Sequence, residues 1–148
     1  MNRTLELAAM LLAPTLLATA PVVAQDPAQA TPVTVEVTGF SPAEGHLVIA
    51  LFDSAATWSG GTAVEGQRIA VEGPTVEVSF GALPAGDYAI KLYHDVDSDG
   101  EMATNLVGIP TEPYAFSNNA LGRMGPASWA DARFRHTGDG AVQSITLN

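Results

Sequence analysis

The fold of this chain is decided by residues 81–95, which read GALPAGDYAIKLYHD. The segment begins with a Pro-Ala-Gly turn, after which apolar and polar side chains alternate. Successive side chains of a β-strand point to opposite faces, so this period of two gathers four side chains on one face. These are Tyr88, Ile90, Leu92 and His94. The stretch therefore predicts a strand that turns one face toward an apolar core.

Six further segments carry strand signals on either side of this one. They are residues 33–40, 45–53, 68–73, 75–80, 131–137 and 141–148. Residues 33–40 (VTVEVTGF) and 75–80 (TVEVSF) alternate cleanly, whereas residues 45–53 are apolar through most of their length, as in a central strand covered on both faces. A Gly-Asp-Gly turn at 138–140 predicts that the last two strands form a hairpin.

About seven short strands separated by turns predict an all-β fold, a single antiparallel β-sandwich with an immunoglobulin-like or transthyretin-like arrangement. Residues 104–130 interrupt the pattern with 27 residues that hold three Pro, three Gly and two consecutive Asn. This stretch is too long for an ordinary connection in a compact domain. We therefore expect one long ordered loop that carries function or lies against the sheet, with a short helical turn capped by Ser128.

The N-terminal residues differ in character from the rest. Residues 1–24 combine an early Arg with an apolar run and small residues at Val22 and Ala24, which predicts a secretory signal peptide cleaved after Ala24. The alternative is a membrane anchor, but two prolines interrupt the run and it falls short of the roughly 20 apolar residues that span a bilayer. We expect a flexible leader at 25–32, one domain at 33–148, and a periplasmic or secreted location.

The net charge of the chain excludes some classes of binding partner. The formal net charge is −10, and it stays with the mature domain because the signal removes one acid and one base. Such an acidic surface argues against nucleic acid and anionic membranes as partners. Metal cations and cationic ligands are compatible with it. No stable membrane span is expected once the signal is cleaved. With no cysteine, an exported chain relies on its core or on a bound ion for stability.

An acidic turn follows the strand at 81–95. Asp95, Asp97 and Asp99 alternate ahead of Gly100, a spacing that aims oxygens at one centre and suits Ca²⁺. The expected ligands are those three carboxylates, the carbonyl of Glu101 and a side-chain oxygen of Asn105. The ninth and twelfth positions of a helix-loop-helix calcium site, counted from Asp95, hold Ala and Leu here, so two usual ligands are missing. The alternative is a solvated acidic turn without an ion.

Two further groups of residues could carry chemistry. His94 with Asp95 or Glu112 could form a hydrolase site, although strand alternation favours a half-buried histidine, and no catalytic signature is present. The loop at 108–126 could present a ligand or partner surface, and the alternative is that its aromatic side chains pack on the sheet while its asparagines satisfy the turn backbone. The residues of this candidate surface are Glu112, Tyr114, Phe116, Ser117, Asn118 and Asn119.

Several short motifs resemble those of the bacterial DUF2141 family, exported β-sandwich proteins of undetermined function. The motifs are G-x-Y-A at 86–89, H-D at 94–95, N-x-x-G-I-P at 105–110 and F-S-N-N at 116–119. The family commonly has an Asp two residues before the first Asn of these motifs, where this chain has Ala103, and that departure removes one cation ligand. The resemblance implies a fold and an exported location but no activity.

Together these features predict an exported binding or envelope-associated module with a Ca²⁺-stabilised acidic loop and an envelope protein or glycan as partner. One alternative is a metal-free module that presents the same loop to a protein or glycan. The other is the hydrolase that uses His94. Since the sequence carries no catalytic signature, we do not expect an enzyme.

Overall fold

The computed structural model describes residues 30–148. The predicted signal peptide and most of the predicted leader lie outside the described residues. The elements follow one another in the order β1 (Thr31–Thr38), β2 (His46–Phe52), α1 (Ala55–Gly60), β3 (Glu65–Ala70), β4 (Thr75–Leu83), β5 (Gly86–Asp95), β6 (Tyr114–Phe116), the 3₁₀ turn η1 (Ser117–Asn119), α2 (Trp129–Ala132), β7 (Phe134–His136) and β8 (Ala141–Thr146). Strand β1 thus begins at Thr31, two residues before the expected start of the domain.

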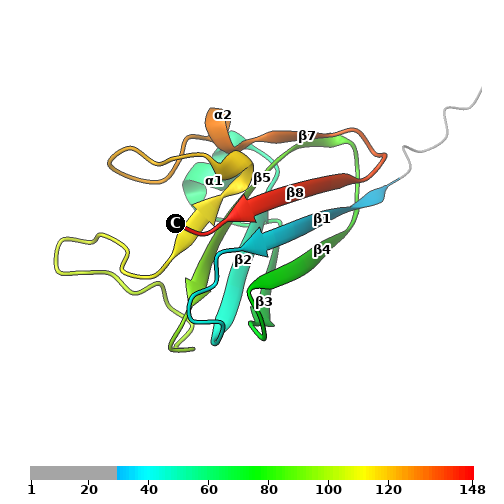
Figure 1. Cartoon of the computed structure of the whole chain (residues 1–148). Helices are drawn as coiled ribbons and strands as arrows, with labels where there is room; N and C mark the ends of the chain where they lie inside the picture. The colour runs from blue at the N-terminus through cyan, green and yellow to red at the C-terminus, as the bar shows by residue number, and fades with distance from the viewer. Residues whose placement is uncertain (1–29) are drawn as a thin grey trace, which may run out of the picture.

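Two sheets pack face to face, which confirms the predicted all-β sandwich (Figure 1). One sheet has the strand order β4-β1-β8. The other has the order β3-β2-β5-β6, with β7 also paired to β5. β6 and β7 share one edge of β5: β7 pairs with its start and β6 with its second half.

The core between the sheets is built from the alternating side chains that the sequence indicated. Its buried members include Val33, Val35 and Val37 of β1, Val76, Val78 and Phe80 of β4, Leu47, Ile49 and Leu51 of β2, and Ile90 and Leu92 of β5. Each strand turns these residues inward because they are two positions apart. Burial of this apolar surface is the main source of the fold's stability.

The expected C-terminal hairpin is wrong. Strand β7 pairs with β5 in one sheet, while β8 pairs with β1 in the other, so the Gly-Asp-Gly turn at 138–140 links the two layers. The β1–β8 pair is moreover parallel, an exception to the antiparallel arrangement expected throughout. Turn chemistry marks where a chain reverses, but the partner of each strand is chosen by long-range packing. The strand expected at residues 131–137 is shorter in the structure, because its first two residues belong to α2 and β7 covers only Phe134–His136.

A short helix that the sequence analysis did not predict covers the outer face of the five-stranded sheet. The side chains of Ser54 and Thr57 form a capping box at the start of α1. Helix α1 buries Trp58 against Phe52, and the indole nitrogen of Trp58 donates to the carbonyl of Ala127 at 3.1 Å. The sequence Ser-Ala-Ala-Thr carried a capping signal that would have located this helix. Among residues 30–148, no helix is long and apolar enough to cross a membrane.

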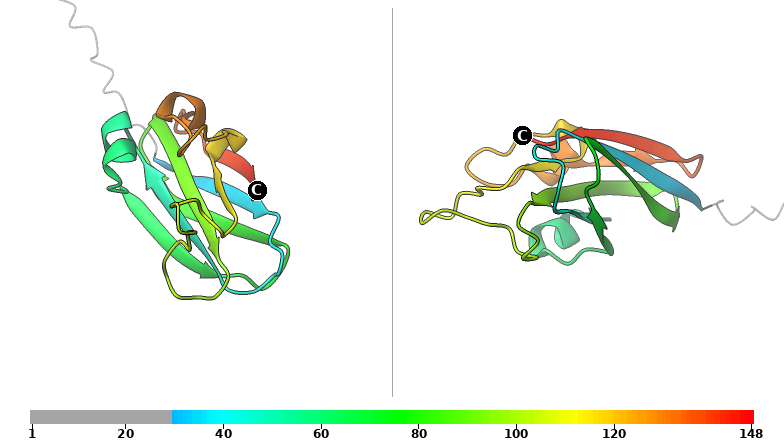
Figure 2. Two further views of the ribbon diagram at one scale, coloured as in Figure 1. Left: turned by 90° about the vertical axis from the view of Figure 1, so that its left-hand side faces the viewer. Right: turned by 60° about the horizontal axis from the view of Figure 1, so that its bottom comes forward.

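The long loop at 104–130 contains structure of its own. It holds β6, η1 and the start of α2, whose N-terminus Ser128 caps as predicted. The segments around residues 105 and 123 project beyond the sheets from the same end of the molecule (Figures 1 and 2). The expectation of an ordered loop folded against the sheet therefore holds for β6, η1 and the start of α2, whereas the tips of the two excursions extend outward.

Candidate functional site

The acidic turn leaves the second sheet at the end of β5. Asp95 is the last residue of that strand and pairs with His46 of β2. Gly45, which has a φ of +76°, lies directly against it, since a Cβ there would come within 2.3 Å of the Asp95 carbonyl oxygen. The turn is thus seated on the rigid end of two paired strands.

Asp95 is buried and has one satisfied and one unsatisfied oxygen. Its Oδ2 accepts hydrogen bonds from Arg68 Nη2 at 2.9 Å and from the amide of Gly100 at 3.1 Å. Its side chain is 0% exposed, whereas that of Arg68 is 42% exposed. Among the described residues no donor reaches Oδ1, which is buried. A carboxylate oxygen left in this state is costly unless a cation or a donor reaches it.

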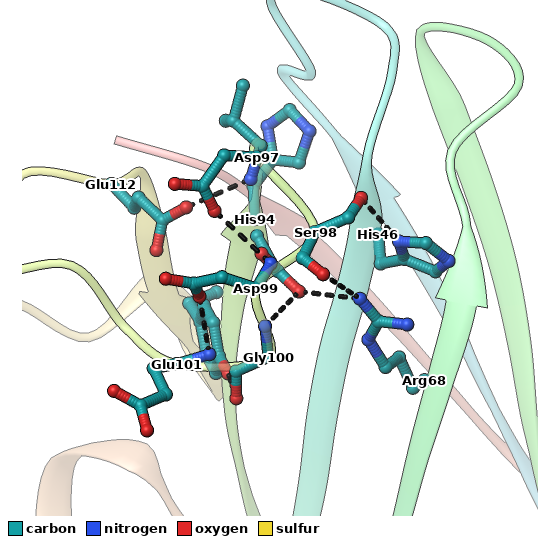
Figure 3. A network of polar contacts seen from close by, with 12 residues as sticks. His46, Arg68, His94, Asp97, Ser98, Asp99, Gly100, Glu101 and Glu112 are labelled. Carbon is teal, nitrogen blue, oxygen red and sulfur yellow. Dashed lines mark hydrogen bonds and ion pairs between the residues drawn. The ribbon is translucent and has the colours of Figure 1, made fainter.

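The carboxylates predicted as metal ligands do converge. One oxygen from each of Asp95, Asp97 and Asp99 lies within 4.8 Å of the other two. Asp97 and Asp99 also shape the turn, because Asp97 Oδ1 accepts from the amide of Asp99 at 3.3 Å and Asp99 Oδ1 accepts from the amide of Glu101 at 2.8 Å. Figure 3 shows Asp97, Asp99 and Glu101 on one side of this network and Arg68 on the other.

Arg68 and the turn amides keep Asp95 ionised. Burial raises the pKa of Asp95, but the hydrogen bond and charge of Arg68, together with the amide of Gly100, outweigh burial and hold the pKa of this carboxyl below its usual range. The site therefore presents a buried negative charge at neutral pH, with a single cationic side chain beside it.

Glu112 ties the acidic turn at both ends. Its Oε1 accepts from the amide of Val96 at 2.9 Å (Figure 3), and its Oε2 accepts from the amide of Ala103 at 3.0 Å. From the sequence, Glu112 was expected in a ligand surface or a hydrolase pair, but in the structure both of its oxygens accept from backbone amides. Its position beside the turn could not be read from the sequence because the contact spans the loop.

Asn105 does not face the acidic cluster. Its Oδ1 accepts from the amides of Val107 and Ile109, each at 3.0 Å, and so closes the turn at the tip of its own loop. The predicted ligand role of Asn105 is therefore not supported. Glu101, the other auxiliary ligand, follows the cluster directly, and its side chain is exposed.

His94 is a core residue. It is 0% exposed, its Nε2 donates to the carbonyl of Glu44 at 2.6 Å, and its ring packs edge-on against Phe40. Burial keeps this imidazole away from any substrate in solvent, and the carboxylate of Glu112 is occupied by backbone amides. The geometry gives no support to the predicted pairing of His94 with Asp95 or Glu112 in a hydrolase.

Most of the loop residues expected to form a ligand surface are structural. Phe116 and Ser117 are buried, and Asn118 Nδ2 donates to the carbonyl of Arg133 at 2.9 Å. Asn119 accepts from the amide of Thr146 at 2.9 Å and so ties the loop to β8. These contacts fit the alternative in which the aromatic side chains pack on the sheet and the asparagines satisfy backbone groups.

Tyr114 and Phe116 instead contribute to an apolar pocket that the sequence analysis missed. The pocket has a volume of about 820 Å³ and lies on the outer face of the second sheet. Its floor comes from β2, β5 and β6 and includes Val48, Tyr93 and Phe116, and its walls come from segments 102–110 and 122–126. The face of β2 that points away from the core, which is also apolar in sequence, therefore forms part of the pocket floor.

Tyr93 connects the pocket to the acidic turn. Its ring lines the pocket, and its hydroxyl donates to the carbonyl of Gly100 at 3.1 Å. Burial, and then the charges of Asp95 and Glu112, raise the pKa of Tyr93, so the phenol remains a donor. One wall of the pocket, from Met102 onward, begins where the acidic turn ends.

Comparison with known proteins places the chain in a family. The model of a family described as "Uncharacterized protein conserved in bacteria (DUF2141)" matches residues 35–144. The match covers most of the sandwich and of the turn and pocket just described, and the chain belongs to this family. No curated protein and no solved structure matches the chain.

Proposed function

We propose that this DUF2141 protein is an exported, envelope-associated binding module whose acidic turn holds Ca²⁺. The ion would be bound by carboxylate oxygens of Asp95, Asp97 and Asp99. Two observations on Asp95 carry the proposal: its buried Oδ1 has no donor among residues 30–148, and its carboxylate contributes an oxygen to a cluster in which one oxygen of each aspartate lies within 4.8 Å of the others. An acidic cluster on a surface needs no ion, but a cluster that includes a carboxylate with a buried, unpaired oxygen is costly without one.

The donor set suits a hard cation. Ca²⁺ takes six to eight oxygens at about 2.3–2.6 Å, and the three carboxylates with the carbonyl of Glu101 and water make up such a set. Arg68 keeps Oδ2 of Asp95, which leaves Oδ1 for the ion. The left-handed backbone at Ser98 and Gly100, with φ of +65° and +83°, curls the turn around one centre.

The ion would act on the pocket through the chain that joins them. A cation at the turn would hold Asp97 and Asp99 together against their mutual repulsion. The wall of the pocket at 102–110 follows the turn directly, and Tyr93 and Glu112 connect the two by hydrogen bonds. Calcium would therefore order a binding surface, a structural role with no part in chemistry.

Thermal unfolding of the purified protein tests this function. A site with a Kd of about 10⁻⁴ M stabilises the fold by about 2 kcal/mol at about 3 mM Ca²⁺, which raises the midpoint by roughly 8 °C over EDTA. Mg²⁺, which demands octahedral geometry, is expected to give a much smaller shift.

Matched variants separate a metal site from a general charge effect. Replacing Asp97 and Asp99 by Asn is expected to abolish the calcium response. The control variant replaces Glu36 and Glu77, exposed and paired across β1 and β4, by Gln, and so removes the same charge from the other sheet. Its response to calcium should equal that of the wild type. A wild-type midpoint that does not move with calcium refutes the proposed metal site.

A further inference from the structure

The apolar pocket on the second sheet has the properties of a ligand site. Its volume of about 820 Å³ falls within the range of about 300–1,000 Å³ that small-molecule sites occupy. Large apolar side chains also stand exposed on the two segments that wall it, among them Leu106, Val107, Ile109 and Met124. Exposed apolar groups gathered at one rim indicate that the pocket takes an apolar partner.

One cation lies in this apolar surface. Lys91, the sole lysine of the chain, lines the pocket from β5. Its ammonium lies 4.8 Å from the ring centre of Phe52 and 4.4 Å from that of Trp58, and it donates to the Trp58 carbonyl at 2.7 Å. Among the described residues, no carboxylate forms an ion pair with Lys91, and no second acceptor receives its remaining N–H groups.

An unpaired ammonium is unexpected at this position. The chain carries a net charge of −10, yet its single lysine lies half-buried among aromatic rings and has no acidic partner in the described part of the chain. Burial lowers the pKa of Lys91, so the protein bears the cost of desolvating this charge. An anionic group bound beside the ammonium would offset that cost with a charge-assisted hydrogen bond.

We propose that the pocket binds a long-chain monocarboxylate, with the carboxylate at Lys91 and the apolar tail along the pocket floor toward Val48 and Ile109. The inference rests on the proposed function as a binding module and gives that module its ligand class. Neither the pocket floor nor Lys91 involves the calcium ligands, so the two proposals can fail separately. Recognition is local, because the negative charge of the rest of the protein is screened beyond roughly 8 Å at physiological salt.

Calorimetric titration with three amphiphiles of one tail length tests the proposal. The probes are dodecanoate, dodecanol and dodecyltrimethylammonium, each kept below its micelle concentration, and the titrations are run in EDTA. Wild-type protein is expected to bind dodecanoate about tenfold or more tightly than dodecanol, because a hydrogen bond between charged groups is worth about that factor. Equal binding of the three probes, or no binding of dodecanoate, overturns the proposal.

Variants at Lys91 assign the head group. Lys91→Met keeps the length of the side chain and should remove the preference for dodecanoate over dodecanol, whereas Lys91→Arg should retain it. The control is Arg135→Met, which removes the same charge from an exposed side chain that does not line the pocket and should bind as the wild type does. Unchanged dodecanoate affinity in Lys91→Met refutes the role of Lys91.

Two further measurements separate this proposal from its rivals. Association with phospholipid vesicles in the absence of dodecanoate binding would assign the exposed apolar rim to a membrane surface and overturn the pocket proposal. Comparing the titrations in EDTA with the thermal scans in calcium separates the two sites: dodecanoate binding without thermal stabilisation by calcium would refute only the metal site. Calcium stabilisation without dodecanoate binding would refute only the ligand.

Discussion

Replacing Ser117 by Ala tests whether the second half of the long loop is a structural part of the sheet. Ser117 is buried, its Oγ accepts from the amide of Ile90 at 2.9 Å, and the same hydroxyl donates to the carbonyl of Ala132 at 2.6 Å. Ile90 lies in β5 between the residues that pair with β7 and those that pair with β6. The hydroxyl thus stands where the edge of β5 has no neighbouring strand.

The cost of the substitution follows from what it leaves unpaired. The amide of Ile90 would lose its acceptor in a buried position, and such a group costs about 1–3 kcal/mol. The carbonyl of Ala132 would lose its shortest donor but keep Asn118 Nδ2 at 3.2 Å, so its share is smaller. We expect Ser117→Ala to lower the free energy of unfolding by about 2–4 kcal/mol and the thermal midpoint by roughly 10 °C.

The assay is urea unfolding followed by the fluorescence of Trp58 and Trp129, with a thermal scan as a second readout. The control is Ser59→Ala on the exposed side of α1, which should change stability by no more than about 0.5 kcal/mol. The dependence on urea should be the same for all three proteins, since the surface exposed on unfolding is unchanged. A loss below about 0.5 kcal/mol for Ser117→Ala would refute the reasoning that the hydroxyl completes the edge of β5.

Two other predictions concern positions around the site. Gly45→Ala should lower the free energy of unfolding by more than about 2 kcal/mol, because Gly45 has a φ of +76° and an added Cβ would overlap the backbone of Asp95. The measurement is thermal unfolding, and an unchanged midpoint would mean that the turn shifts freely. The pKa of Lys91 is lowered in the folded state, whereas in the unfolded chain it is about 10.4. Between these two pKa values the unfolded chain binds more protons than the folded protein, so the contribution of Lys91 to the free energy of unfolding should rise as the pH rises. The difference in unfolding free energy between wild type and Lys91→Met should therefore grow in favour of the wild type from neutral to alkaline pH, and a difference independent of pH would contradict it.

The strands of the core could be predicted because their signal is local. Alternation places Val33, Val35 and Val37 on one face of β1 whatever strand lies beside it, and the same holds for Leu92 and His94 in β5. The rule placed His94 on the inward face and predicted that it would be half-buried, whereas the structure buries it completely. The side-chain period of a strand is a property of the backbone, so it needs no knowledge of the partner.

Strand pairing could not be predicted in the same way. The turn at 138–140 has the residues of a hairpin, yet β7 and β8 lie in different sheets. Strands β6 and β7 are three residues each, too short for an alternation signal, and they are held by the long edge of β5. Helix α1 was missed although its capping residues were legible, because a helix of six residues shows no clear period.

In the candidate site, too, the features set by local sequence could be predicted and those set by distant contacts could not. The spacing of Asp95, Asp97 and Asp99 was sufficient to bring their oxygens together, since a tight turn converts spacing directly into proximity. The burial of Asp95, its pairing with Arg68 of β3 and the anchoring role of Glu112 depend on segments distant in the chain. Asn105 was assigned to the cluster from its nearness in sequence, whereas its amide closes a separate turn.

The all-β class, the inward faces of the strands and the clustering of acids after β5 follow from the amino-acid sequence, because each arises from contacts or periods within a few residues. The neighbours of each strand depend on the packing of the folded chain. So do the buried oxygen of Asp95 and the ammonium of Lys91, neither of which has an ionic partner for that atom within residues 30–148. Those properties depend on which surfaces the two sheets and the long loop bring together, and that choice is made by the packing of the whole chain.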